Sequence, residues 1–178
     1  MKNLLIFLFL SLEMLVFAQK PFNLALKINP YTMLTGRYGV NLEIPLSKDF
    51  SATLEGRYLT KDWNADGGEI FNSLKKSKGV NAIVGLRYYF PIEKKYRWYL
   101  SSEYRFRRAT FENTGTVKTF NEGNLITGLQ LFPKNTKFTL DFGIGSGINT
   151  EKRTFPQSEP FKRNFGVIRI DILLGYKF

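Results

Sequence analysis

The stretch that decides the fold is Val167 to Phe178, which reads Val-Ile-Arg-Ile-Asp-Ile-Leu-Leu-Gly-Tyr-Lys-Phe. Every second residue from Ile168 to Phe178 is apolar, whereas the intervening positions carry three charges. A period of two predicts a β-strand with one face in apolar surroundings. Its length matches that of a tilted strand that crosses a bilayer. We therefore expect this strand to close a transmembrane barrel by pairing with the first strand.

Seven earlier segments show the same alternation of apolar and polar residues. They are 22–29, 37–44, 50–58, 80–90, 98–107, 124–131 and 138–147. The links at 46–49, 91–95 and 132–136 are short, whereas those at 59–78, 109–123 and 149–164 are longer and polar; the link at 30–36 is short. Eight strands with alternating link lengths predict an all-β chain. We expect this chain to form an eight-stranded antiparallel up-and-down transmembrane β-barrel with short periplasmic turns and longer extracellular loops.

The alternation alone does not say which face points outward. The apolar face is bulky on nearly every strand, and the interior of an eight-stranded barrel is narrow. The polar faces carry both signs of charge, which can pair inside a barrel, and aromatic residues gather near strand ends, as in interfacial girdles. These features favour a barrel whose apolar face points outward. The alternative is a soluble, lipocalin-like barrel that turns its apolar face inward and carries an apolar ligand.

The first eighteen residues predict a secretory signal peptide. Lys2 precedes an apolar run, and Val16-Phe17-Ala18 offers a cleavage site before Gln19. The run is shorter than a spanning helix needs, and Glu13 interrupts it. We therefore expect a signal peptide at 1–18 and an exported barrel domain at 19–178, in the outer membrane.

Composition limits the chemistry that the chain can perform. The 178 residues include no cysteine and no histidine, which excludes thiol nucleophiles, disulfides and the usual histidine-dependent hydrolase mechanisms. We therefore expect no enzyme activity, and we assign no catalytic, cofactor-binding or metal-binding residue. The net charge of +11 favours anionic partners. No recognition motif for nucleic acid accompanies it.

The first three strands carry a family resemblance. Leu24-Ala25-Leu26-Lys27-Ile28-Asn29, Tyr38-Gly39-Val40-Asn41-Leu42-Glu43 and Leu46-Ser47-Lys48-Asp49-Phe50-Ser51 resemble the opening of small outer-membrane barrels common in Bacteroidota. That family has no established function. In layout it is similar to OmpA-type and OmpX-type eight-stranded barrels. The resemblance implies a fold and a location, and it implies no catalytic residue.

Two loop features are candidate sites. Asp62-Trp63-Asn64-Ala65-Asp66-Gly67 has the spacing of the first half of a calcium loop, but the twelfth position is Ser73, and the acid Glu69 comes too early. A polar loop tip is the simpler interpretation. The second feature is a set of basic residues expected in the outer loops, where they could pair with glycolipid phosphates or remain solvated. They are Lys61, Lys75, Lys76, Lys78, Lys118, Lys152, Arg153, Lys162 and Arg163.

The interior charges lead to the functional hypotheses. A packed, salt-bridged interior predicts a non-enzymatic outer-membrane protein with a structural or surface-interaction role, whose loops contact glycolipid or a partner protein. A continuous water path lined by the excess arginine would instead make a narrow anion-preferring pore. Arg105 is expected to point inward, and its change to Ala is expected to cost about 3–5 kcal/mol by stranding buried acids.

Overall fold

The computed structural model describes residues 24–63, 74–90, 96–133, 136–156 and 158–178. The expected signal peptide lies outside them. The elements, in chain order, are β1 (Ala25–Ile28), α2 (Pro30–Leu34), β2 (Arg37–Pro45), β3 (Phe50–Trp63), β4 (Leu74–Tyr89), β5 (Tyr96–Phe111), β6 (Val117–Leu131), β7 (Phe138–Phe155) and β8 (Ser158–Lys177).

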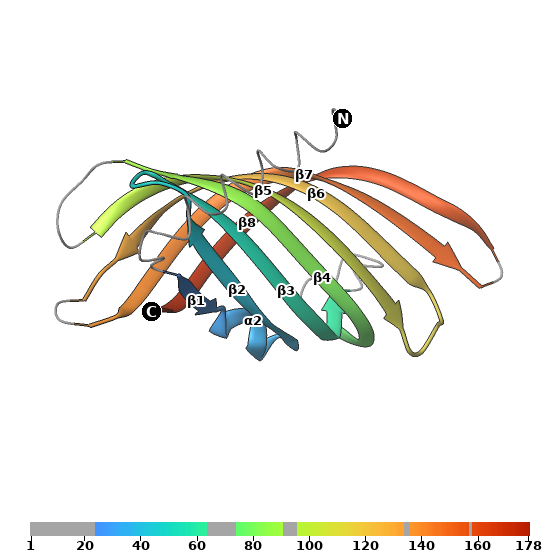
Figure 1. Ribbon diagram of the computed structural model, residues 1–178. Coiled ribbons are helices and arrows are strands. Elements are labelled where there is room, and N and C mark those ends of the chain that lie inside the picture. Colours follow the sequence, from blue (N-terminus) through green and yellow to red (C-terminus); the bar gives the residue numbers. More distant parts are fainter. Residues whose placement is uncertain (1–23, 64–73, 91–95, 134–135, 157) are drawn as a thin grey trace, which may run out of the picture.

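The strands form a closed antiparallel barrel in which each strand pairs with its neighbours in sequence and β8 pairs with β1. The predicted fold class is confirmed. Following the register from Ala25 through every strand leads to Val167, ten residues before Lys177, the actual partner of Ala25. This stagger of ten residues tilts the strands relative to the barrel axis. Figure 1 shows the C-terminus and the β2–β3 turn at one end, and the β5–β6 and β7–β8 hairpins at the other.

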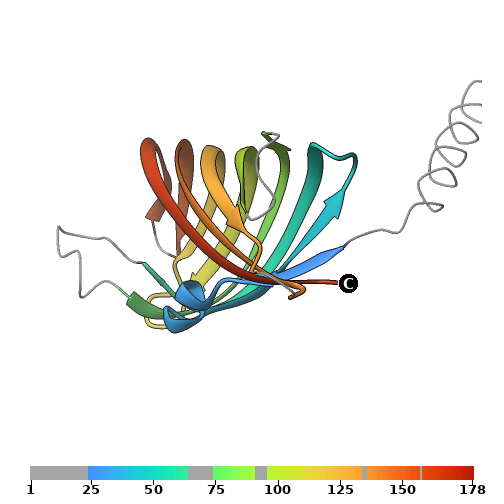
Figure 2. The same cartoon turned by 90° about the vertical axis from the view of Figure 1, so that its left-hand side faces the viewer.

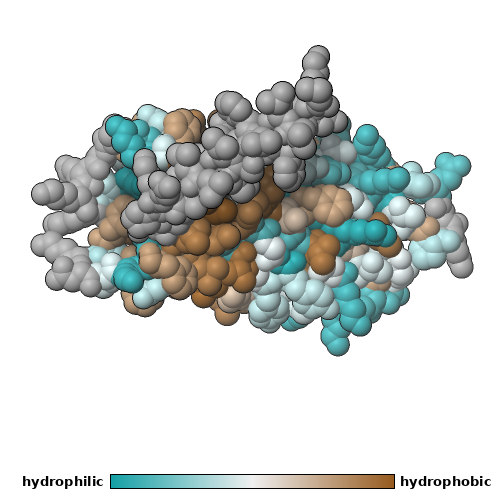
Figure 3. Space-filling model, in the orientation of Figure 1, coloured by the Kyte–Doolittle hydropathy of each residue, from teal (hydrophilic) through white to brown (hydrophobic). Residues whose placement is uncertain are grey.

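The inward and outward faces follow the predicted alternation on all eight strands. On β8, Ile168 is 83% exposed on the outside, and Asp171 is buried inside. Ile83 and Tyr89 are apolar or aromatic but were assigned to the inward face by their positions in the alternation, and both are buried. Figure 3 shows apolar residues gathered along the barrel wall, while hydrophilic residues cover the end formed by the β5–β6 and β7–β8 hairpins. The described interior is polar, so it provides no apolar lumen for the lipocalin-like alternative.

The strands are longer than predicted at the hairpin end. Segments expected as loops at 109–123 and 149–164 are mostly strand, because β5 ends at Phe111, β6 begins at Val117, and β7 and β8 are separated only by residues 156–157. The outward face of β7 is apolar up to Ile148, except at Ser146, and then turns polar at Thr150 and Lys152. A strand that projects beyond the apolar band faces water on its outside, so apolar alternation stops before the strand does.

A short helix interrupts the wall between β1 and β2. Asn29 caps it by accepting a hydrogen bond from the Thr32 backbone at 3.1 Å, Pro30 starts it, and Gly36 follows it at a φ of +79°. These are preferred residues for such positions. Proline also has no N–H for the sheet ladder, so β1 ends before it. The segment 30–36, expected as a plain link, therefore forms α2, which lies beside β8 (Figure 2). Among the described residues, no helix is long and apolar enough to cross a membrane.

Candidate functional site: a basic cavity above an ion-paired plug

A network of buried charges fills the barrel at the end that carries the β2–β3 turn. Asp141 of β7 is fully buried and accepts hydrogen bonds from Lys27 Nζ at 2.5 Å and Arg87 Nη1 at 2.7 Å. Gln130 Nε2 donates a third hydrogen bond to Asp141, at 3.0 Å. Lys27 also pairs with Glu43, so two cations share two carboxylates. We call this cluster the plug: Lys27, Glu43, Arg87, Gln130 and Asp141.

Aromatic rings seal the plug on the β4–β5 side. The Arg87 guanidinium lies 4.0 Å from the centre of the Tyr99 ring, and the Tyr89 hydroxyl donates a hydrogen bond to Glu43. The Tyr99 ring fits because Gly128 and Gly143 on the neighbouring strands have no side chain. Each plug residue is less than 5% exposed, and charges buried in this way are stable only when they are paired and hydrogen-bonded.

A second layer of ion pairs continues up the barrel. Arg169 Nη1 donates a hydrogen bond to Glu103 at 2.5 Å, and its Nε lies 2.8 Å from Asp171. Arg57 pairs with Glu55, its neighbour two residues earlier on the inward face of β3. Two stacked layers of ion pairs favour the salt-bridged interior of the sequence analysis over the continuous water path of a pore.

Above these layers the interior opens into a cavity of about 310 Å³. Its cationic lining residues come from five strands and are Arg37, Arg105, Arg107, Lys118, Arg153, Arg163 and Arg169. Two acids, Glu122 and Glu151, line it as well. Seven cations and two acids thus line a space the size of a small ligand pocket, and Arg169 among them also pairs with Glu103 and Asp171 in the layer below. We call this space the basic cavity.

The register explains why these side chains converge. Arg107 of β5 lies opposite Phe120 of β6, which lies opposite Glu151 of β7, which in turn lies opposite Arg163 of β8. All four occupy the alternate strand positions that point toward the inside of the barrel. The Arg107 guanidinium covers the Phe120 ring at 3.9 Å. This row of paired positions thus places Arg107 and Arg163 on either side of Glu151, on the inward face of the sheet.

Glu151 organises the upper rim of the basic cavity. Its carboxylate accepts hydrogen bonds from Arg153 Nε at 2.6 Å and Arg163 Nε at 2.7 Å, and Lys118 Nζ lies 3.8 Å away. Burial alone would raise the pKa of Glu151, but the two arginines outweigh it and hold the pKa below the usual value. Glu151 lies beyond Ile148, the last outward apolar residue of β7.

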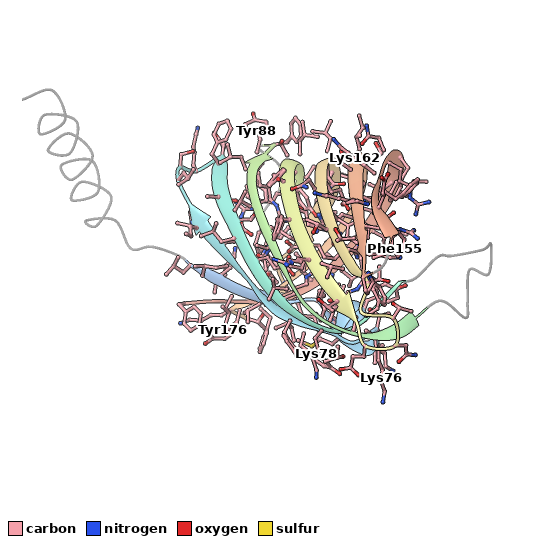
Figure 4. The ribbon with its side chains drawn as sticks, turned by 90° about the vertical axis from the view of Figure 1, so that its right-hand side faces the viewer. Lys76, Lys78, Tyr88, Phe155, Lys162 and Tyr176 are labelled. Carbon is pink, nitrogen blue, oxygen red and sulfur yellow. The ribbon has the colours of Figure 1, made fainter. Side chains whose placement is uncertain are left out.

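The structure separates the predicted basic residues into two groups, apart from Lys75, whose side chain lies outside the described part of the chain. Lys118 and Arg153 are buried and line the cavity together with Arg163, although they were expected in the outer loops. Lys61, Lys76, Lys78, Lys152 and Lys162 are exposed on the strands. Figure 4 shows Lys76, Lys78 and Lys162 pointing away from the barrel. Lys78 pairs with Glu112 at 3.1 Å, which raises the pKa of Lys78.

The remaining predicted site residues have different outcomes. Arg105 points inward as expected and pairs with Glu122 at 3.5 Å, and Glu122 also accepts a hydrogen bond from Asn124 at 2.8 Å. The calcium-like segment extends from the end of β3 into residues 64–73, which lie outside the described part of the chain, as does Ser73. Within the described ranges, no group of three or more acidic side chains is placed to hold a metal ion.

Comparisons with known proteins add little to this geometry. No protein-family model matches the chain, and no curated protein sequence matches it. The resemblance to Bacteroidota barrels therefore stays an expectation. One similar solved structure is described as a major outer membrane protein from Thermus thermophilus. It is 14% identical, covers 89% of this chain and 100% of its own, and has a TM-score of 0.44, a likeness too weak for an argument about function.

Proposed function

We propose that this chain is an integral protein of a bacterial outer membrane with a structural or surface-interaction role and no enzyme activity. The observation that carries the proposal is the distribution of side chains on a closed barrel. Large apolar residues are exposed all around the wall, whereas the ion pairs lie inside. Only a bilayer supplies apolar surroundings for such a wall, and closure leaves few backbone groups to satisfy there.

The apolar band gives the proposed orientation and depth. On β7 the band extends from Phe138 to Ile148, which agrees with the roughly 9–11 residues of a tilted spanning strand. The polar hairpins beyond Ile148 then lie outside the cell, and the β2–β3 turn lies in the periplasm. In this orientation the plug closes the periplasmic half of the lumen, and the basic rim faces glycolipid or a partner protein at the surface.

The proposal is tested by cysteine labelling, because the natural chain has no cysteine. Lys152→Cys lies at the outer rim, and Lys48→Cys lies in the β2–β3 turn at the opposite end. In intact cells, a membrane-impermeant maleimide is expected to label Lys152→Cys, and to label Lys48→Cys only after lysis. Labelling of both or neither before lysis would refute the orientation. Discrete single-channel openings in planar bilayers would refute the closed plug and favour the narrow pore.

A further inference from the structure

The wall of the barrel has a notch beside the basic cavity. β1 pairs with β8 only from Ala25 to Ile28, and the last pair joins Ile28 to Leu174. From Ser158 to Leu173, β8 pairs with β7 alone in the part of the chain that the structure describes. Pro30 follows β1 and starts α2, which contacts both β2 and β8. Above α2, the free edge of β8 faces the start of β2 at Arg37.

The basic cavity reaches this notch. Its lining includes Arg37 on the β2 side and Arg163 and Arg169 on the β8 side. It also includes Ile168, which points outward and is 83% exposed. A side chain of the outer wall borders an interior cavity only where the wall ends. The basic cavity therefore opens sideways as well as toward the hairpin end.

The cations of the basic cavity begin at the depth of the lipid headgroups and continue toward the aqueous side. Ile148 and Ile168 mark the upper edge of the apolar band, and Arg153 and Arg163 follow within five residues along their strands. At about 3.3 Å per residue along tilted strands, the cations lie within roughly 15 Å of that edge. The headgroup layer on each side of the hydrocarbon core is roughly 5–8 Å thick, so Arg169, next to Ile168, lies within it, and Arg153 and Arg163 lie at its aqueous side. An open sheet edge at membrane depth is tolerated only where it lines a polar cavity.

We infer that the basic cavity binds the phosphate monoester of a lipid headgroup, which enters from the outer leaflet through the notch while the acyl chains stay outside. This inference rests on the proposed membrane location. Arginines hold phosphate through paired, charge-assisted hydrogen bonds, and Arg37 and Arg163 on the two sides of the notch supply them. The acyl chains would lie against Ile168 and Ile170 of β8 and Leu34 of α2, which are all exposed apolar residues.

The first experiment measures lipid preference in the folded protein. The chain is refolded into phosphatidylcholine nanodiscs, its closure is verified by heat-dependent gel mobility, and the binding of fluorescent phosphatidic acid is compared with that of fluorescent phosphatidylcholine. We expect at least a tenfold preference for phosphatidic acid. Arg37→Gln and Arg163→Gln are each expected to weaken binding of phosphatidic acid about three- to tenfold. Lys162→Gln, the neighbouring outward charge on β8, is the matched control and is expected to change binding less than twofold.

The outcomes separate the alternatives. An equal loss in Lys162→Gln would mean diffuse surface attraction and would overturn the inference. Displacement of phosphatidic acid by micromolar inorganic phosphate would assign the cavity to a soluble anion and overturn lipid entry. A protein that folds but shows no preference refutes the cavity assignment alone, whereas a protein that fails to close in lipid refutes the proposed function.

A second experiment tests the route. Phosphatidic acid with a photoreactive group on its acyl chain is cross-linked in the same nanodiscs, and the adducts are mapped by mass spectrometry. Lateral entry predicts adducts on Ile168, Ile170 and Leu34 that exceed those on the opposite wall at Val84 and Tyr104 by at least fivefold. Equal labelling of the two walls would contradict entry through the notch.

Discussion

Asp141→Asn is the sharpest test of the plug. The substitution keeps the shape of the side chain but removes one of the two charges that balance Lys27 and Arg87. The amide group of the new side chain would then face two cations, and only Glu43 would compensate them. Removing one partner of a buried pair typically costs about 3–5 kcal/mol. Because Asp141 is completely buried and bonds to both cations, we expect a loss in this range.

The assay is equilibrium unfolding in urea from phosphatidylcholine vesicles, followed by tryptophan fluorescence; Trp98 lies on the outer wall. Asp49→Asn is the control, because the Asp49 carboxylate pairs with the highly exposed Lys48, at 3.8 Å. We expect the control to change the free energy of unfolding by no more than about 0.5 kcal/mol.

A double variant isolates the ion pair. Lys27→Met combined with Asp141→Asn leaves one cation, Arg87, opposite Glu43, so the plug is neutral again. We expect the double variant to be more stable than the sum of the two single losses implies, by about 1–3 kcal/mol. If Asp141→Asn unfolds like the wild type, or if the two losses simply add, the charges do not act as one network and the reasoning fails.

Three further changes test other parts of the structure. Arg105→Ala is expected to lower the free energy of unfolding by about 1–3 kcal/mol in the same assay. This loss is smaller than the sequence suggested, because Asn124 still donates a hydrogen bond to Glu122. An unchanged free energy would mean that the Arg105–Glu122 pair does not stabilise the fold. Gly128→Ala is expected to cost about 1–3 kcal/mol, because a Cβ there would overlap the Tyr99 ring, whereas Gly56→Ala has open space and is the control. The lowered pKa of Glu151 stabilises the fold above the ordinary glutamate value of about 4.3, and this contribution disappears as the pH falls through the lower folded pKa. Glu151→Gln is therefore expected to flatten the acid limb of the stability–pH curve, and an unchanged limb would show that the two arginines do not act through Glu151.

The sequence predicted the faces of the strands better than their ends. Period-two alternation placed Lys27, Arg87 and Asp141 inside without any knowledge of their partners. It could not show that Lys27 and Asp141, 114 residues apart, meet, because that contact depends on the register of the closed barrel. The outer ends of β5 to β8 were taken for loops because their outward residues face water.

The notch and the basic cavity were not predicted. The signal for the helix was present in Asn29, Pro30 and Gly36, which are typical residues for a helix start and a helix end, but the segment was interpreted only as a short link. Arg153 and Arg163 were predicted only as basic residues of the outer loops. Their convergence on Glu151 follows from the extension of β7 and β8 beyond the apolar band.

The most direct test of the central claim, a closed barrel with its apolar face in the membrane, is heat-dependent gel mobility of the protein from outer-membrane fractions. After washing with carbonate, we expect the protein to stay in the membrane fraction and to migrate differently before and after boiling in detergent. Protein in the soluble periplasmic fraction, with the same mobility in both lanes, would contradict the account.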